Sequence, residues 1–415
     1  MAADGVSLRR NIGELSLHRR SGGLNARERV MEGRLAGLAT AFFVLADMER
    51  EGEGSENSEA DEMDEDATTF LLFRQDMLTA RLIERPPYVF HRKTFADYGE
   101  AECYNRMRFR REDLPRLQHV LGIPDVLHGK NRALYLGEEA LVFLLLRMAY
   151  PDRLSDFEEE FGRDYTSLSR LFRVITKFLY DRHSHVLKDG LAAWTDHFPE
   201  FARVIARVTT VDGDDHVVAF VDGTLRPTTR LSQVEGAVDD AQRGAYNGHH
   251  RTHGIKFQGV MAPNGIMIAL HGPFAGNRHD AYLMDRTGLN ALMATAQLVP
   301  APPRKHVVYG DAAYGIMPYV QRGFRGVNLT EAQRRYNRKM SAARICVEWG
   351  FGETMTNFAL LDYKKNLKIF LSPIGQWCTV AQLLQNCHTC LYGSNATRYF
   401  NLAAPSLEDY FDMFT

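Results

Sequence analysis

Four short β-rich runs in the second half of the chain constrain its fold more than any other feature. They are VVAFV (217–221), IKFQGVM (255–261), IMIALHG (266–272) and HVVYG (306–310), each bounded by Gly, Pro or Asn. Pro263-Asn264-Gly265 predicts a hairpin turn between the second and third runs. A helix is expected from about Ala281 to Leu298. Three strands, a helix, another strand and later helices predict an α/β or α+β core with a mixed sheet.

The region before these strands, from Thr69 to about Tyr180, has a helical pattern. Residues 138–150 (EEALVFLLLRMAY) are apolar on most faces, which predicts a buried helix that ends at Pro151.

Residues 154–180 contain a possible helix-turn-helix. A short helix ending near Phe161, a turn at Gly162 and a second helix capped by Thr166 or Ser167 give that layout. A plain helical hairpin fits the same pattern, and the acidic residues 158–160 would repel DNA phosphates. Both interpretations stay open at this point.

The ends of the chain differ in composition from its middle. Residues 25–50 have apolar residues at helical spacing, whereas residues 51–66 hold nine acidic residues and no basic one. That acidic run is either a solvated linker or a charge mimic that shields a DNA-binding surface. Since the net charge is −2, the rest of the chain carries about seven positive charges in excess, which is compatible with a polyanionic partner.

These patterns divide the chain into four parts. We expect a flexible N-terminal region with an acidic linker (1–68), a helical domain (69–205), a strand-containing domain (206–398) and a C-terminal tail (399–415). The tail, rich in Phe and Tyr, could either pack on the body or bind a partner. Five cysteines fit a reducing compartment, and the longest apolar run, Leu35 to Ala46, is too short to span a membrane. We therefore expect an intracellular protein without a membrane segment.

Three carboxylates are candidates for catalysis. Asp222 and Asp311 each follow a predicted strand, and Glu348 lies on a helix expected to begin near Ser341. Carboxylates at strand ends are held rigidly and point into the cleft beyond the sheet, and a helix packed across the sheet could bring the third one there.

Metal chemistry would explain such a gathering of acids. Two Mg²⁺ or Mn²⁺ ions about 4 Å apart can activate an attacking oxygen and stabilise the departing one in phosphodiester cleavage. The alternatives are structural: Asp222 could be a turn residue before Gly223, Asp311 a helix cap, and Glu348 an ion-pair partner of Arg344.

A basic stretch leads into the Glu348 helix and is a candidate DNA contact. One acid, Glu331, lies within it. Contact with DNA phosphates and a merely solvated basic face are both possible. The candidate DNA-binding residues, with Lys256 added from the second strand, are Arg322, Arg325, Arg334, Arg335, Arg338, Lys339, Arg344 and Lys256.

Several ordered blocks resemble the PIF/Harbinger type of DDE-superfamily transposases. They are VDGT, YNGHHRTHGIKFQGVMAPNGIMIALHGPFAGNRHDAYLMDR, VVYGDAAYGI and RKMSAARICVEWGFG, within a resemblance that extends from about Glu102 to Tyr392. The resemblance implies an RNase H-like mixed-sheet catalytic core, preceded by a helical domain with a possible helix-turn-helix. Residues 206–398 would then be the DDE nuclease domain.

The resemblance also assigns roles. It implies that Asp222, Asp311 and Glu348 are the catalytic and metal-bridging carboxylates, with Mg²⁺ or Mn²⁺ as cofactor and Asp280 as a supporting acid. Its further implications are duplex DNA as substrate, the nucleus as location, and cleavage followed by strand transfer. An accessory DNA-binding protein and a homo-oligomer are possible partners. The alternatives are a domesticated factor that binds DNA or protein without cutting, and an enzyme that hydrolyses RNA or RNA–DNA hybrids.

Overall fold

The structure is a computed structural model that describes residues 92–209, 216–231, 238–297 and 305–414. The helix expected over residues 25–50, the acidic run 51–66 and the boundary at residue 68 lie outside the described residues.

A mixed sheet forms the centre of the second half of the chain. Its strands are β3 (Val217–Pro227), β5 (Thr252–Met261), β6 (Met267–Ala275), β7 (Val307–Gly310) and β8 (Val320–Arg322), and the short β4 (Tyr246–Asn247) pairs with the beginning of β5. The spatial order is β6-β5-β3-β7-β8. β3, β7 and β8 are parallel, whereas β5 is antiparallel to both β3 and β6. This arrangement confirms the expected RNase H-like mixed sheet.

Burial and turn chemistry explain why these residues form the sheet. The apolar run Val217–Val221 in β3 is at most 1% exposed, as expected for a central strand covered on both faces. In the hairpin between β5 and β6, the Ala262 amide donates to the Ile266 carbonyl at 3.0 Å. Gly265 has φ +81° there, a backbone conformation that a side chain would strain. The predicted hairpin is confirmed.

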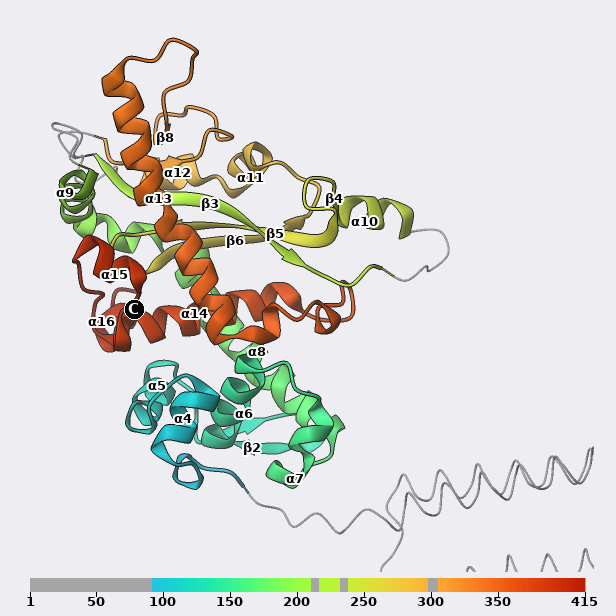
Figure 1. Ribbon diagram of the computed structural model, residues 1–415. Coiled ribbons are helices and arrows are strands. Elements are labelled where there is room, and N and C mark those ends of the chain that lie inside the picture. The colour runs from blue at the N-terminus through green and yellow to red at the C-terminus, as the bar shows by residue number, and fades with distance from the viewer. Residues whose placement is uncertain (1–91, 210–215, 232–237, 298–304, 415) are drawn as a thin grey trace, which may run out of the picture. The chain divides into compact units, whose positions relative to one another are not determined.

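Helices cover both faces of the sheet. α13 (Glu331–Asn357) and α9 (Phe198–Thr209) pack against β3, whereas α8 (Tyr165–Lys188) and α14 (Ile374–Tyr392) pack against β6. Figure 1 shows α13 crossing in front of β3. α13 begins well before the expected position near Ser341, because Thr330 caps it by accepting a hydrogen bond from the Gln333 amide at 3.2 Å.

The connection between β6 and β7 differs from the expected single helix over 281–298. It consists of α11 (Asp280–Thr287) and α12 (Leu289–Ala296), which are separated by Gly288 in the left-handed region at φ +62°. A glycine in this conformation ends a helix, and the chain starts a new one. The remaining helices of this half are α10 (Val238–Ala245), α15 (Asn395–Phe400) and α16 (Leu407–Asp412).

The first half of the described chain is helical, as expected. It contains α4 (Glu100–Met107), α5 (Leu114–Val120), α6 (Gly137–Ala149), α7 (Glu158–Phe161) and α8, with a small hairpin of β1 (Val126–His128) and β2 (Leu134–Leu136). Short 3₁₀ helices lie at Phe95–Asp97, Arg111–Asp113, Lys130–Arg132, Leu154–Phe157, Gly190–His197, Ala359–Leu361 and Lys364–Asn366. Residues 140–145 of α6 are fully buried, which confirms the expected buried helix.

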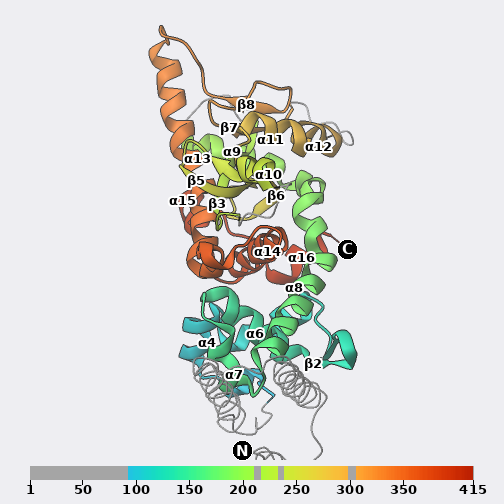
Figure 2. The same cartoon turned by 90° about the vertical axis from the view of Figure 1, so that its right-hand side faces the viewer.

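The helix–turn–helix layout is present in residues 154–188. Gly162 makes the turn with φ +58°. The expected cap at Thr166 or Ser167 is wrong: the Asp164 side chain accepts from both of these amides, at 2.9 and 3.2 Å, so α8 begins at Tyr165. α8 also continues to Lys188 and contacts both α6 and α14, so it joins the helical half to the sheet half (Figure 2).

The C-terminal tail packs on the body of the protein. Leu407, Tyr410 and Phe411 of α16 are buried, and the Asn386 amide of α14 donates to the Tyr410 hydroxyl at 2.9 Å. The sequence left two alternatives for the tail, packing on the body or binding a partner, and in the structure the tail packs on the body. Among the described helices, none combines the length and apolar character that a bilayer crossing requires.

A buried ion pair fixes α6 to the turn before α8. Arg163 donates to both carboxylate oxygens of Glu139, at 2.6 and 2.9 Å, and the two side chains are 7% and 0% exposed. The Arg163 guanidinium also lies 5.1 Å from the centre of the Tyr135 ring. A carboxylate in this position neutralises a charge that would otherwise be buried among apolar side chains.

Removal of this carboxylate should destabilise the protein. We expect Glu139→Ala to lower the free energy of unfolding by about 3–5 kcal/mol, because the Arg163 charge loses its buried partner. The exposed pair of Lys177 and Asp181, at 2.6 Å, provides the control: Asp181→Ala should cost about 0.5 kcal/mol or less. Urea denaturation measures both, and a loss below about 1 kcal/mol for Glu139→Ala would contradict this role.

Candidate active site

The two aspartates lie on neighbouring parallel strands. The register pairs Phe220 of β3 with Tyr309 of β7, and two residues further along each chain stand Asp222 and Asp311. Asp311 directly follows β7, as expected. Asp222 does not end its strand, because β3 continues to Pro227 as the partner of β5, so the expected strand end was wrong.

Gly223 is a strand residue and not part of a turn, so the alternative of an Asp-Gly turn is also wrong. It is paired with Gln258 on β5. An ideal Cβ on Gly223 would lie 2.7 Å from Oδ1 of Asp280, which means that the Asp280 carboxylate occupies the space above this glycine. Asp280 is the first residue of α11 and pairs with Lys256 of β5 at 3.1 Å. A fourth acid therefore adjoins Gly223, the residue next to Asp222, and a lysine accompanies it.

Asp311 shapes the turn that follows β7. Its Oδ1 accepts a hydrogen bond from the Ala313 amide at 2.8 Å, and the Tyr314 amide donates to its carbonyl at 3.3 Å. The chain then proceeds through a turn to β8 without an intervening α-helix, so the alternative role of Asp311 as a helix cap is wrong. Asp311 itself is half-buried beside exposed Ala312 and Ala313.

Arg344 connects the third carboxylate to the first. Both Glu348 and Arg344 lie on α13, four residues apart. The Arg344 guanidinium donates one hydrogen bond to Oδ2 of Asp222 and another to Oε1 of Glu348, the latter at 3.4 Å. Arg344 and Asp222 are 18% and 17% exposed, whereas Glu348 is 57% exposed. The pairing of Glu348 with Arg344, expected as an alternative role, thus exists within the carboxylate cluster itself.

Burial dominates the electrostatics of Asp222. Desolvation raises the pKa of this carboxyl to about 6, and the neighbouring carboxylates of Asp311 and Glu348 add to the rise. Arg344 and the Gly223 amide oppose it by stabilising the charged form. An acid with a raised pKa among other acids attracts cations, and Arg344 supplies one positive charge from the protein itself.

The carboxylate oxygens of this site are ligands that a hard divalent cation prefers, but the side chains are not arranged as a complete metal-binding site. In the part of the chain that the structure describes, no three His, Cys, Asp or Glu residues gather closely enough to hold a metal ion. Asp222 and Asp311 offer adjacent oxygen ligands of the kind that Mg²⁺ and Mn²⁺ prefer. Glu348 contacts Arg344 through Oε1 at 3.4 Å, so Arg344 competes with a cation for this oxygen.

Tyr314 belongs to this cluster and was missed by the sequence analysis. Its ring packs against Gly310, where an ideal Cβ would lie 2.6 Å from Cδ2, and its hydroxyl lies 3.8 Å from an ideal Cβ on Gly223. Within the described residues, this buried hydroxyl has no hydrogen bond of ordinary length. Burial raises the pKa of the phenol well above its usual range, and Asp280 and Asp222 add to the rise. Its position three residues after Asp311 was the available signal.

The eight candidate DNA-binding residues fall into three groups. Five are exposed, on the loop after β8 and the first half of α13; Arg322 is half-buried at the end of β8; and Lys256 and Arg344 are paired with acids. The exposed five are Arg325, Arg334, Arg335, Arg338 and Lys339. Arg338 also pairs with Glu331 at 3.1 Å. Figure 2 shows the first turns of α13 extending beyond the sheet. The exposed cations on these turns therefore lie beside the sheet and not over it.

Comparison with known proteins identifies the sheet half. Residues 221–386 match the family model of the DDE superfamily endonuclease, a segment that includes Asp222, Asp311 and Glu348. This match confirms the resemblance shown by the ordered sequence blocks. Searches of curated proteins and of solved structures found no match.

The raised pKa of Asp222 predicts a pH dependence of stability. The unfolded carboxyl ionises near pH 4 and the folded one near pH 6, so between these values the unfolded chain binds fewer protons and the folded state loses stability as the pH rises. Asp222→Asn removes this loss. In EDTA, its unfolding free energy relative to wild type should rise by roughly 3 kcal/mol at most between pH 4 and pH 7. A difference that stays constant with pH would contradict the buried, charged environment of Asp222.

Proposed function

Because residues 221–386 form a DDE superfamily endonuclease domain, we propose that this protein cuts double-stranded DNA with two divalent cations and joins the resulting ends, as a transposase does. The observation that carries the proposal is that Asp222 and Asp311 stand at matching positions of the parallel strands β3 and β7, and that Arg344 links Glu348 of α13 to Asp222. Three acids from separate elements repel one another unless cations lie among them. Mg²⁺ or Mn²⁺ is the cofactor that these oxygen ligands suit.

The bound cations would supply an activated attacking oxygen and a stabilised leaving oxygen. The protein's own residues provide the setting for this chemistry. Parallel pairing holds Asp222 and Asp311 side by side, and the glycine at 223 leaves room for the Asp280 carboxylate. Lys256 binds Asp280 and thereby keeps this fourth acid oriented and partly neutralised. Asp280 thus acts as a positioning residue.

The substrate follows from the same surroundings. The exposed cations on the loop after β8 and on α13 lie on the elements that flank the carboxylates, where they can bind backbone phosphates. Double-stranded DNA is therefore the proposed substrate, and the nucleus is the proposed place of action.

A second candidate is a DNA-binding protein derived from a transposase that no longer cuts. The pairing of Arg344 with Asp222 and Glu348 favours it, because an internal cation already neutralises part of the cluster. The two candidates differ in one measurable property, which is metal-dependent cleavage.

Asp311→Asn tests the proposed cleavage. With Mg²⁺ or Mn²⁺, wild-type protein should nick supercoiled DNA, and the variant should lose the activity by a factor of at least about 10³, since a neutral amide binds the cation poorly. DNA affinity should remain within about twofold of wild type, because Asp311 is not a phosphate contact. Asp285→Asn, on the exposed side of α11, is the matched control and should cut normally. Equal nicking by Asp311→Asn and wild type would sink the assignment; DNA binding without any nicking would establish the second candidate.

Arg344→Gln tests the internal cation. Without metal, the variant should unfold at a lower temperature than wild type, because Asp222 and Glu348 then repel each other without compensation. Added Mn²⁺ should raise the midpoint of the variant more than that of wild type, since no arginine competes for the carboxylates. Arg335→Gln, an exposed change on the same helix, should match wild type in both respects. An equal Mn²⁺ response of Arg344→Gln and wild type would show that Arg344 does not compete with the cation.

A further inference from the structure

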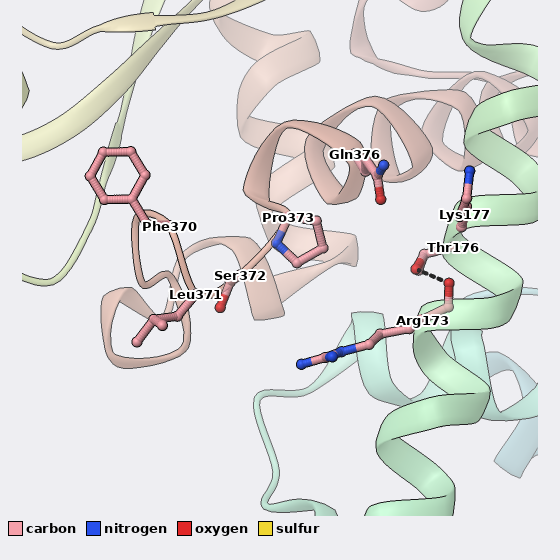
Figure 3. A pocket seen from close by; sticks show the side chains of 8 residues that line it. All are labelled: Arg173, Thr176, Lys177, Phe370, Leu371, Ser372, Pro373 and Gln376. Atoms are coloured by element: carbon pink, nitrogen blue, oxygen red, sulfur yellow. Dashed lines mark hydrogen bonds between the residues drawn. The ribbon is translucent and has the colours of Figure 1, made fainter. Parts of the chain in front are cut away.

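An open hollow lies away from the carboxylates, between α8 and the loop that precedes α14. Its volume is about 390 Å³. Figure 3 shows Arg173, Thr176 and Lys177 of α8 on one side and Phe370, Leu371 and Ser372 of the loop on the other. The Thr176 hydroxyl donates to the Phe172 carbonyl of its own helix at 2.6 Å, so the charged side chains are the ones available to a ligand.

The α8 side of the hollow is a basic stripe. Arg170, Arg173 and Lys177 are exposed and stand three and four residues apart, which places them on one face of the helix. Lys177 pairs with Asp181 at 2.6 Å, whereas Arg170 and Arg173 form no ion pair with any of the described residues. Figure 3 shows the Arg173 side chain extending from α8 toward the loop.

The loop side combines another cation with unusually exposed apolar side chains. Phe370 and Leu371 are 80% and 72% exposed. Phe370 has φ +69°, a left-handed backbone conformation that strains a bulky residue. The amides of Leu371 and Ser372 donate to the Lys368 carbonyl at 3.1 and 2.8 Å, which closes the turn and keeps exposed Lys368 beside them. The backbone thus holds an aromatic ring outward next to a positive charge.

β3 links this loop to the proposed active site. Thr229, two residues after the end of β3, donates from its amide to the Leu367 carbonyl at 3.0 Å. Asp222 and Thr229 are seven residues apart, so this part of the chain spans at most about 25 Å. Successive base pairs of DNA rise about 3.4 Å, so Thr229, which bonds this loop, lies at most about seven base pairs from Asp222. Figure 1 shows β3 running past α13 in the direction of this loop.

We propose that Arg170, Arg173, Lys177, Lys368, Phe370 and Leu371 form a second DNA-binding surface, which grips duplex DNA about one helical turn or less from the cut. This rests on the proposed function, because it takes the DNA bound at the carboxylates as the same molecule. Arg170, Arg173, Lys177 and Lys368 contact backbone phosphates, and the side chains of Phe370 and Leu371 pack on the sugar edge between them.

The chemistry of the surface favours nucleic acid over a small ligand. A small molecule is held by burial in a closed, mostly apolar pocket. Here the largest apolar side chains are mostly exposed and the cations are exposed as well, which suits an extended polyanion. The positive end of α14, whose first residue Ile374 follows Pro373 without a side-chain cap, adds to the potential.

The test is duplex binding by the full chain in EDTA, where no cleavage occurs. Fluorescence anisotropy with a labelled 40-base-pair duplex, repeated at several salt concentrations, gives the Kd and its salt dependence. Arg173→Gln/Lys177→Gln should raise the Kd at least about tenfold at 0.1 M salt and reduce the slope of log Kd against log salt by roughly two. Phe370→Ser should weaken binding without changing that slope, because it removes no charge.

Two controls separate the surface from general charge and from folding. Arg111→Gln/Arg203→Gln removes the same number of exposed arginine or lysine charges elsewhere, and its salt slope should equal that of wild type. All variants should keep the wild-type thermal midpoint, since the altered side chains are exposed.

Each outcome decides the matter. Unchanged Kd and slope for Arg173→Gln/Lys177→Gln would overturn the surface, and metal-dependent nicking that Asp311→Asn abolishes would still support the nuclease. Weaker binding of single-stranded but not duplex DNA would also overturn it. Tighter duplex binding by the variant would overturn it too. A surface that binds as proposed, in a protein that never nicks, would refute the nuclease alone.

Discussion

The charge balance around Arg344 is the constraint on which the candidate site depends. Its guanidinium joins Asp222 on a central strand to Glu348 on the crossing helix, although the two acids are far apart in the sequence. Without a positive charge between them, the largely buried carboxylate of Asp222 and the exposed one of Glu348 would repel each other. The same arginine would compete with a bound metal ion, because it already donates to one oxygen of Asp222 and one of Glu348. The contacts of Arg344 with Asp222 and Glu348 therefore affect both the stability of the metal-free protein and the binding of metal.

The rest of the site is built outward from the parallel pairing of β3 and β7. That pairing aligns Asp222 with Asp311, and the absence of a side chain at Gly223 admits the Asp280 carboxylate with its Lys256 partner. β3 then continues beyond the acids and reaches the loop that carries Phe370. One strand thus connects the proposed cutting site to the proposed second DNA-binding surface, which gives the two a fixed spacing.

Local patterns in the sequence predicted those features that depend on local physics. The buried helix α6, the hairpin at Gly265 and the position of Asp311 after a strand all follow from burial, turn chemistry and periodicity. The length of β3 was missed because its second half is polar and is specified by pairing with β5, which one strand's pattern does not contain. The pairing of Arg344 with Asp222 and the position of Tyr314 beside these acids were missed for the same reason: the fold alone brings these side chains together. The three carboxylates were proposed from the ordered blocks that contain them, whereas their internal counterion carries no such signal.

The most direct test of the central claim is a crystal structure of the full chain soaked in Mn²⁺, with anomalous diffraction measured at the manganese edge. The account predicts an anomalous peak between Asp222 and Asp311, with Glu348 turned toward it and Arg344 displaced from both acids. An absence of any peak at millimolar Mn²⁺, with Arg344 still bound to Asp222 and Glu348, would contradict it.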